Sequence, residues 1–213
     1  MAENSSHWSD LVLLHSSLSE AACMTWVRDV DQTEPLRRIG GEAPFRMRSL
    51  DELDLEIEAL YNAGSEMFLW EPIGAIVVRV SDNWTLLVEP NGWAGTMAAE
   101  LPEISAGTEA VSIFWNVNAD SEIAVVNDGY AIAVISDVIM FAGEGGQAQG
   151  TLNDVTGTDP ALVKDLVTDL NNLQDLSWKP TALQWVERYT GVRIPDGWLD
   201  RPHPGSVFTK HRG

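Results

Sequence analysis

Cysteine is nearly absent from this chain, and long apolar runs are absent altogether. The 213 residues contain one cysteine, Cys23, which excludes an intrachain disulfide and a zinc site built on a cysteine pair. No apolar run approaches the ~20 residues that a membrane-spanning helix needs. The first residues also lack the basic and apolar regions of a secretory signal peptide. These observations predict a cytoplasmic protein with no membrane partner.

Basic residues are also scarce. The chain has 13 Lys and Arg against 32 Asp and Glu, a formal net charge of -19. Phosphates would be repelled by such an excess, so no nucleic-acid partner is expected. Residues 49–163 hold 19 of the acidic side chains and one cation, Arg79. This segment projects a negative field that attracts cations and basic proteins, although the same charge would also serve solubility alone.

Motifs for catalysis and for cofactor binding are missing. The sequence has no H-E-x-x-H, no G-x-S-x-G and no Walker loop. The histidines all lie in the terminal segments, at His7, His15, His203 and His211. We therefore expect no cofactor, no metal and no catalytic residue, which favours a protein that is not an enzyme.

Hydrophobic patterns predict an α+β fold. Helices are expected over residues 17–28, 35–39, 49–62, 158–170 and 180–191. Strands are expected at 76–80, 84–88, 111–117, 122–126 and 130–136, with Asp128-Gly129 suited to a tight hairpin turn. The prediction is an antiparallel meander of about five strands with the N- and C-terminal helices packed on one face.

Domain organisation follows from the same patterns. We expect a single domain over residues 1–200. The segment 201–213 contains Pro-His-Pro and is predicted to be a disordered tail. The glycine-rich segment 143–150 is predicted to be a surface loop.

Two polar segments stand out as a candidate binding patch. One follows the first predicted hairpin and the other ends the strand near residue 117. If they meet, their carboxylates and amides, framed by two tryptophans, would suit a cation, an amine or a sugar-like ligand. The candidate residues are Glu89, Asn91, Trp93, Trp115, Asn116, Asn118 and Asp120. The structural alternative is that Asn and Asp cap turns while the tryptophans fill the core.

Tryptophan is abundant, with nine in the chain. Three of them lie in polar or proline-flanked stretches, where exposure would make them interface anchors. These are Trp8, Trp178 and Trp198.

Several strings resemble a known family. They include C-M-T-W-V-R from Cys23, L-L-V-E-P-N-G-W ending at Trp93 and F-W-N-V-N-A from Phe114. Over about residues 19–199 the chain resembles a family of actinobacterial single-domain proteins of unknown function, for which E-P-N-G-W and F-W-N-V-N are the most specific motifs. The resemblance implies one domain and brings no established activity or catalytic residue.

The function that these observations favour is a non-enzymatic acidic module that masks a basic protein partner, in the manner of an immunity protein, antitoxin or inhibitor. One alternative is a binder of a small-molecule or carbohydrate-derived ligand, or a hydrolase using Glu89 and Asp120 as paired carboxylates. Another is an inhibitor that mimics nucleic acid. The sequence leaves the oligomeric state open.

Overall fold

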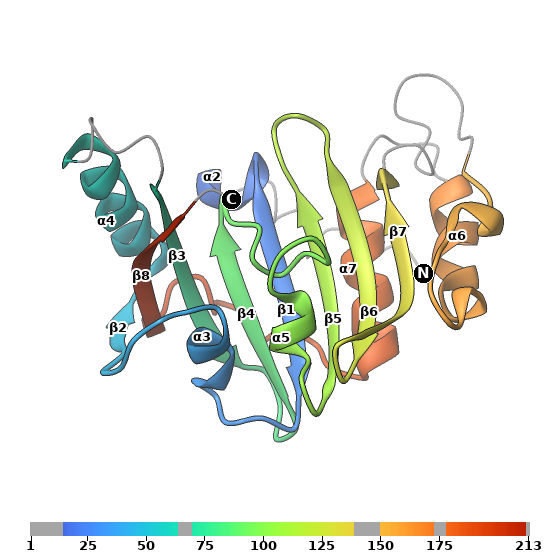
Figure 1. Ribbon diagram of the computed structural model, residues 1–213, viewed down its shortest axis with the longest axis horizontal. Helices are drawn as coiled ribbons and strands as arrows, with labels where there is room; N and C mark the ends of the chain where they lie inside the picture. Colours follow the sequence, from blue (N-terminus) through green and yellow to red (C-terminus); the bar gives the residue numbers. More distant parts are fainter. Residues whose placement is uncertain (1–14, 64–69, 139–149, 173–177, 212–213) are drawn as a thin grey trace.

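One antiparallel sheet forms the centre of the molecule (Figure 1). The structure is a computed structural model that describes residues 15–63, 70–138, 150–172 and 178–211. Within these ranges the sheet has eight strands in the order β2-β8-β3-β4-β1-β5-β6-β7. The strands are β1 (Ala22–Arg28), β2 (Arg46–Arg48), β3 (Trp70–Arg79), β4 (Trp84–Pro90), β5 (Glu109–Trp115), β6 (Ser121–Asn127), β7 (Tyr130–Ser136) and β8 (His203–His211). The α+β class is confirmed, whereas the expected number of about five strands is too low.

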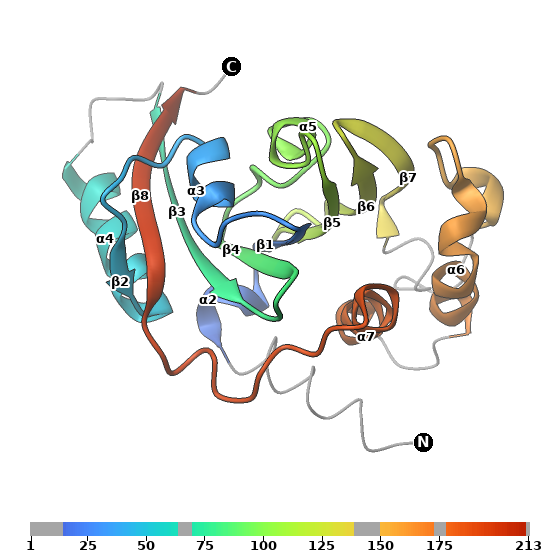
Figure 2. The ribbon, with the colours of Figure 1, turned by 90° about the horizontal axis from the view of Figure 1, so that it is seen from below.

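Helices cover both faces of this sheet. They are α2 (Ser16–Ser19), α3 (Glu34–Arg38), α4 (Leu50–Ala63), α5 (Leu101–Ile104), α6 (Lys164–Asn171), α7 (Trp178–Thr190) and the 3-10 helices η2 (Leu152–Asp154) and η3 (Pro160–Val163). Figure 2 shows α3 and α5 inside the curve of the sheet, with α2, α4, α6 and α7 around its outer side. Leu36 and Leu101 belong to the inner core, and Leu53 and Leu183 to the outer core. The expectation of helices on one face is wrong, because the central strands are apolar on both faces and both faces need cover.

The strand β1 replaces most of the helix expected at residues 17–28. It lies between β4 and β5, and six of its seven residues are buried. Trp26 faces the outer core and Val27 the inner core. A strand buried on both faces has a continuous apolar sequence, which periodicity alone does not distinguish from a buried helix. Its insertion also breaks the expected meander, because β4 and β5 are no longer neighbours.

The strand β8 occupies most of the segment that was expected to be a disordered tail. It pairs with β3 over seven positions and with the short strand β2 on its other side. Val207 packs against the outer core and Phe208 against the inner core. The prolines at its start suggested a tail, but Val, Phe and Thr favour a strand once a partner edge exists. That edge belongs to β3, more than a hundred residues earlier in the chain.

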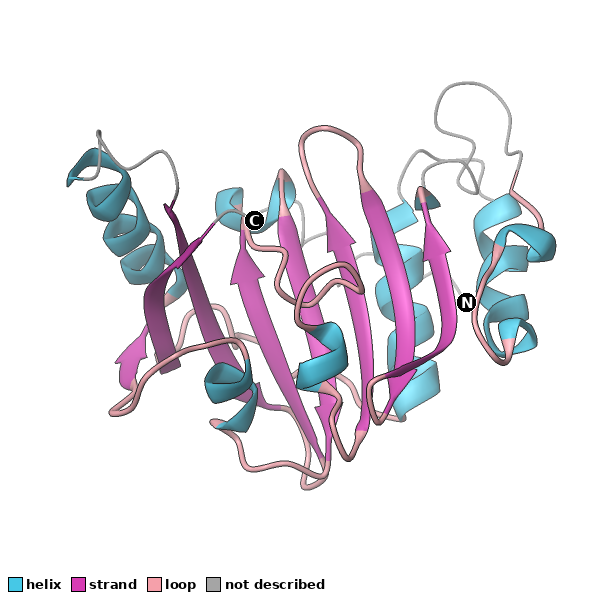
Figure 3. Cartoon of the chain, in the orientation of Figure 1, coloured by secondary structure: helices cyan, strands magenta, loops and turns pink. Residues whose placement is uncertain are grey.

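Local sequence signals predicted both hairpins correctly. Figure 3 shows β3 and β4, and then β6 and β7, joined by short turns. The first hairpin has the expected register, with Val78 opposite Leu86. In the second, Asp128 and Gly129 have φ angles of 48° and 79°. A type I′ turn requires positive φ at both central positions, which is why Asp-Gly was a reliable signal.

Helices α2, α3, α4, α6 and α7 overlap the expected ranges, whereas α5 and η2 were not predicted. Helix α4 begins at a capping box, in which the Ser49 and Glu52 side chains each accept a hydrogen bond from the backbone N–H of the other. Helix α7 ends at Gly191, which has a φ of 70°. The glycine-rich loop predicted at 143–150 lies outside the described residues except for Gly150.

Candidate functional site

The sheet separates the residues of the predicted binding patch. In β1, Ala22 lies between Pro90 of β4 and Trp115 of β5. The next residue, Cys23, lies between Glu89 and Phe114 in the same way. Residues paired across strands share a face, and successive residues alternate between faces. Glu89 therefore points to the inner side of the sheet and Trp115 to the outer side. The seven candidate residues do not form a single patch.

Glu89 is fully buried and holds the loop that follows β4. Its carboxylate accepts hydrogen bonds from the backbone N–H groups of Ala94 and Gly95, at 2.9 and 3.0 Å. A Cβ at Gly92 would lie 2.5 Å from the Glu89 Cβ, and Asn91 has a left-handed φ of 52°. The segment Glu-Pro-Asn-Gly-Trp thus forms a tight turn that packs against the Glu89 side chain. Trp93, at the end of this turn, is half-buried.

A buried polar layer lies beneath this loop. Thr25 and Ser112 share a hydrogen bond of 3.0 Å, and the Cys23 thiol lies 3.4 Å from the Ser112 hydroxyl. A Cβ at Gly95 would come within 2.1 Å of the Thr25 hydroxyl, so only glycine allows this close approach. Burial, followed by the nearby Glu89 carboxylate, raises the pKa of the Cys23 thiol well above its usual value. The thiol therefore stays protonated and unreactive.

The other predicted residues organise the turn between β5 and β6. The Asn116 side-chain oxygen accepts hydrogen bonds from the backbone N–H groups of Asn118 and Asp120, at 2.9 and 3.0 Å. Its amide nitrogen donates to the Asp120 carboxylate at 2.8 Å. Ala119 has a φ of 69°. These three polar residues lie together, and the hydrogen bonds among them stabilise a turn.

A cavity of about 180 Å³ lies beside this turn. We call it the Trp115 pocket, and its lining consists of Trp115, Asn116, Val117, Ala119, Asp120, Ser121, Trp178 and Lys179. The rings of Trp115 and Trp178 meet edge to face, with centroids 6.3 Å apart and an interplanar angle of 87°. The Trp115 indole donates to the Leu18 carbonyl at 2.9 Å. Three of the predicted residues, Trp115, Asn116 and Asp120, are therefore brought together here.

Sequence reasoning missed the other half of this pocket. Trp178 and Lys179 come from the first turn of α7, about sixty residues after β5, and nothing local connects the two segments. The expected exposure of Trp178 and Trp198 is wrong, because both are buried in the outer core. Trp8, the third predicted anchor, lies outside the described residues.

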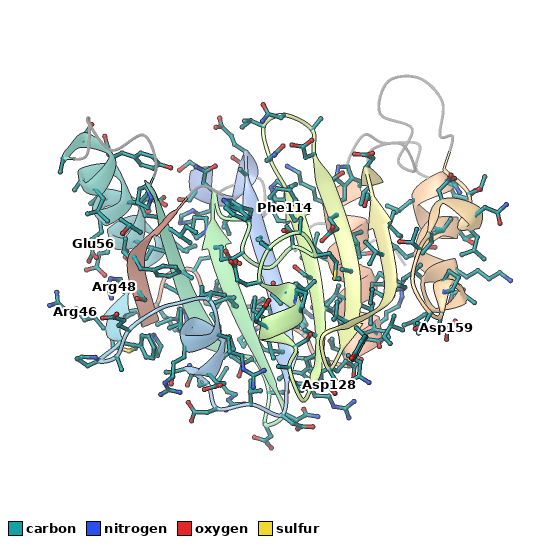
Figure 4. The ribbon with its side chains drawn as sticks, in the orientation of Figure 1. Arg46, Arg48, Glu56, Phe114, Asp128 and Asp159 are labelled. Carbon is teal, nitrogen blue, oxygen red and sulfur yellow. The ribbon has the colours of Figure 1, made fainter. Side chains whose placement is uncertain are left out.

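The helix α4 carries the most acidic surface of any helix in the described part of the chain. Its 14 residues include five carboxylates and no cation. Glu56 forms a two-pronged ion pair with Arg48 of β2, with N–O distances of 3.1 and 3.0 Å (Figure 4). Asp51 lies 3.7 Å from the His15 ring nitrogen. Burial raises the pKa of Asp54, whose carboxylate accepts a hydrogen bond from Ser17.

Apolar side chains interrupt this acidic surface. Leu55 is 65% exposed, and Leu60 and Tyr61 are 40% and 44% exposed. The sequence signal for Leu55 was present, because it falls off the apolar stripe of Leu50, Leu53 and Ile57. The sequence predicts a helix over residues 49–62 but does not distinguish its buried leucines from this exposed one.

Among the described residues, no three His, Cys, Asp or Glu side chains come together as metal ligands. In the same part of the chain, no helix has the length and apolar character needed to cross a membrane.

Comparisons with known proteins give one result. No curated protein and no solved structure matches the chain. A family model does match, over residues 4–203, which is nearly the whole sequence. The chain belongs to DUF6461, a family of unknown function.

Proposed function

We propose that this protein is a non-enzymatic binding module that masks a basic protein partner, and that the outer face of α4 makes the contact. This outer face consists of Asp51, Glu52, Leu55, Glu58 and Ala59. The opposite side of the helix carries Leu50, Leu53 and Ile57 into the outer core.

The environment of Leu55 is the observation that carries the proposal. On a helix, residues three and four positions away are the nearest surface neighbours. For Leu55 these neighbours are three carboxylates and one alanine, which are Asp51, Glu52, Glu58 and Ala59. A 65% exposed leucine surrounded by acids matches the plan of an interface with an apolar centre and a charged rim. The partner that complements it has an apolar pocket with Lys and Arg around it.

The charge of the surrounding segment supports the same conclusion. Residues 49–163 contain one cation, Arg79, whose guanidinium donates to the backbone carbonyls of Asp82 and Val30. The field of this segment is therefore negative, and such a field steers a positively charged partner during diffusional encounter.

Site-specific photocrosslinking tests the contact. A photoreactive amino acid replaces Leu55 in one variant and Tyr130 in a matched control, because Tyr130 is 73% exposed and lies at the opposite end of the sheet. In lysate of the source organism, we expect a basic protein to crosslink at position 55 and not at position 130. Crosslinks to acidic proteins, equal crosslinking at both positions, or none at position 55 would contradict the proposal.

Kinetics with the purified partner then test the role of charge. We expect the association rate to fall as ionic strength rises while the dissociation rate changes little. Leu55→Ser should weaken binding about tenfold or more while changing the free energy of unfolding by less than about 0.5 kcal/mol. A rate of association that is independent of salt would argue against electrostatic steering.

A further inference from the structure

One of the residues that line the Trp115 pocket, Ser121, has a buried hydroxyl group with no hydrogen-bond partner among the described residues. Ser121 is 6% exposed, and its Oγ forms no hydrogen bond within the described residues. Leaving a buried polar group unpaired is unfavourable, so each such group calls for an explanation. Ser121 pairs directly with Trp115 across β5 and β6, which places both side chains on the outer face, at the pocket.

A positive charge, the Lys179 ammonium, also lines the pocket. The Lys179 ammonium is 5.1 Å from the centroid of the Trp115 ring and donates to the Ser19 carbonyl at 2.8 Å. Lys179 also belongs to the first turn of α7, a helix of 13 residues. The N-terminal end of a helix dipole is positive, so it adds to the field of the ammonium and favours an anionic group.

The apolar walls limit the body of the ligand. Trp115 and Trp178 are 1% and 4% exposed and form the hydrophobic side of the pocket. A cavity of ~150 Å³ accommodates benzene, so 180 Å³ suits about six to eight non-hydrogen atoms. Most of a nucleotide or an oligosaccharide would lie outside this volume.

We propose that the Trp115 pocket binds a small carboxylate with an apolar body. The carboxylate accepts a hydrogen bond from Ser121 and lies in the field of Lys179, while the body contacts the two tryptophans. The serine hydroxyl can take three staggered positions by rotation about the Cα–Cβ bond, and the hydrogen bond to the ligand would select the one that reaches it. The pocket is separate from the outer face of α4, so the failure of one proposal would not contradict the other.

Three related compounds test the recognised group. Isovalerate is valine without its amino group, and isobutylamine is valine without its carboxylate. We expect isovalerate to shift the indole NMR signals of Trp115 and Trp178 in a saturable way, with a Kd on the order of 1 mM. Isobutylamine should cause no comparable shift. Equal binding of the amine, or no saturable shift by isovalerate up to about 50 mM, would overturn the proposal.

Valine itself tests the rim of the pocket. The Asp120 carboxylate is exposed there, beside Asn116. If valine binds more tightly than isovalerate, and Asp120→Asn removes this difference in affinity, the ligand also carries an ammonium group. Weaker or equal binding of valine means that the carboxylate alone is recognised. Both results support a carboxylate site and distinguish amino acids from simple acids as its occupant.

Paired variants test the residues. Ser121→Ala and Lys179→Gln should each weaken isovalerate binding about tenfold or more. Ser136→Ala and Lys164→Gln make the same chemical changes at exposed positions on β7 and α6 and should leave the affinity unchanged. Ser121→Ala should not lower the Tm, because the hydroxyl that it removes has no hydrogen-bond partner in the part of the chain that the structure describes. Equal affinity in all four variants would overturn the assignment.

Discussion

The carboxylates of Glu89 and Glu122 hold the chain between β4 and α5 against the sheet. Glu89 accepts the N–H groups of Ala94 and Gly95, and Glu122 accepts the Met97 N–H at 2.8 Å. A carboxylate that accepts backbone N–H groups makes stronger hydrogen bonds than a neutral acceptor. At the scale of single residues, these acids therefore connect a loop to the sheet, and the excess of negative charge is not all on the surface.

Replacing Glu89 tests this structural role. In Glu89→Gln one of the two acceptor oxygens becomes an amide NH₂ group, which is a donor. The backbone N–H of Ala94 or Gly95 that faces it then loses its hydrogen-bond acceptor. We expect the free energy of unfolding, measured with urea, to fall by about 1–3 kcal/mol. Glu103→Gln, at an exposed position on α5, is the matched control and should change it little. A Glu89→Gln protein as stable as wild type would contradict the role assigned to this carboxylate.

The environment of Glu122 predicts how the stability of the protein depends on pH. Burial raises the pKa of its carboxyl above the usual 4.5, although the Met97 N–H opposes this shift. The folded state then binds a proton more tightly than the unfolded state, so the contribution of Glu122 to stability falls as pH rises from 4.5 through the raised pKa. Glu122→Gln keeps an acceptor for Met97 and removes the buried charge.

Unfolding measured across pH checks this sign. We expect Glu122→Gln to be more stable than wild type at neutral pH, with the difference shrinking as the pH falls toward 4.5. Glu103→Gln should show no such trend. A difference that grows at low pH would mean that the carboxylate is stabilised, not penalised, by its surroundings.

At the scale of elements, β8 decides whether the sheet is complete. It lies between β2 and β3, and its side chains contribute to the cores on both sides of the sheet. Without it, β3 becomes an exposed edge with unpaired backbone groups, and β2 has no neighbour in the sheet.

Truncation tests the importance of β8. A chain that ends at Arg201 should fail to fold or should aggregate, as seen by circular dichroism and size-exclusion chromatography. Removing only the two residues after His211 should leave a folded protein, because β8 stays intact. A disordered tail would tolerate both deletions equally, so a folded, monodisperse product of the longer deletion would count against the pairing.

The elements also show what the sequence was able to predict. Asp128-Gly129 and the Ser49 capping box act through bonds a few residues away, so hairpins and α4 could be predicted locally. The placement of β1 and β8 depends on distant partners, and their residues carry no sign of which edge they join. The same limit applies to the site, because the Asn116 turn is local whereas Lys179 reaches Trp115 only through the tertiary fold.

At the scale of the whole molecule, the net charge of -19 acts on stability as well as on binding. Like charges repel most in the compact state, and salt screens this repulsion. The Debye length falls from ~30 Å at 0.01 M to ~3 Å at 1 M ionic strength. Repulsion across the molecule is therefore strong in dilute buffer and short-ranged in concentrated salt.

Thermal unfolding at several concentrations of NaCl tests this effect. We expect the Tm to rise with salt, by about 2–4 °C for each kcal/mol of repulsion that is screened. A neutral solute at equal osmolality is the control, because it does not screen charge. A Tm that falls with NaCl would mean that attractive ion pairs, such as Arg48 with Glu56, outweigh the repulsion.

The position of β8 also has a consequence for synthesis on the ribosome. Strand β3 is made more than a hundred residues before β8, so its outer edge can be paired only after β8 has been translated. The hairpin of β3 and β4 can pair with β1 beforehand, whereas β2 must wait together with that edge. The nascent protein thus exposes an aggregation-prone edge until β8 has been translated and paired, and its folding should depend on chaperones that shield such edges during translation.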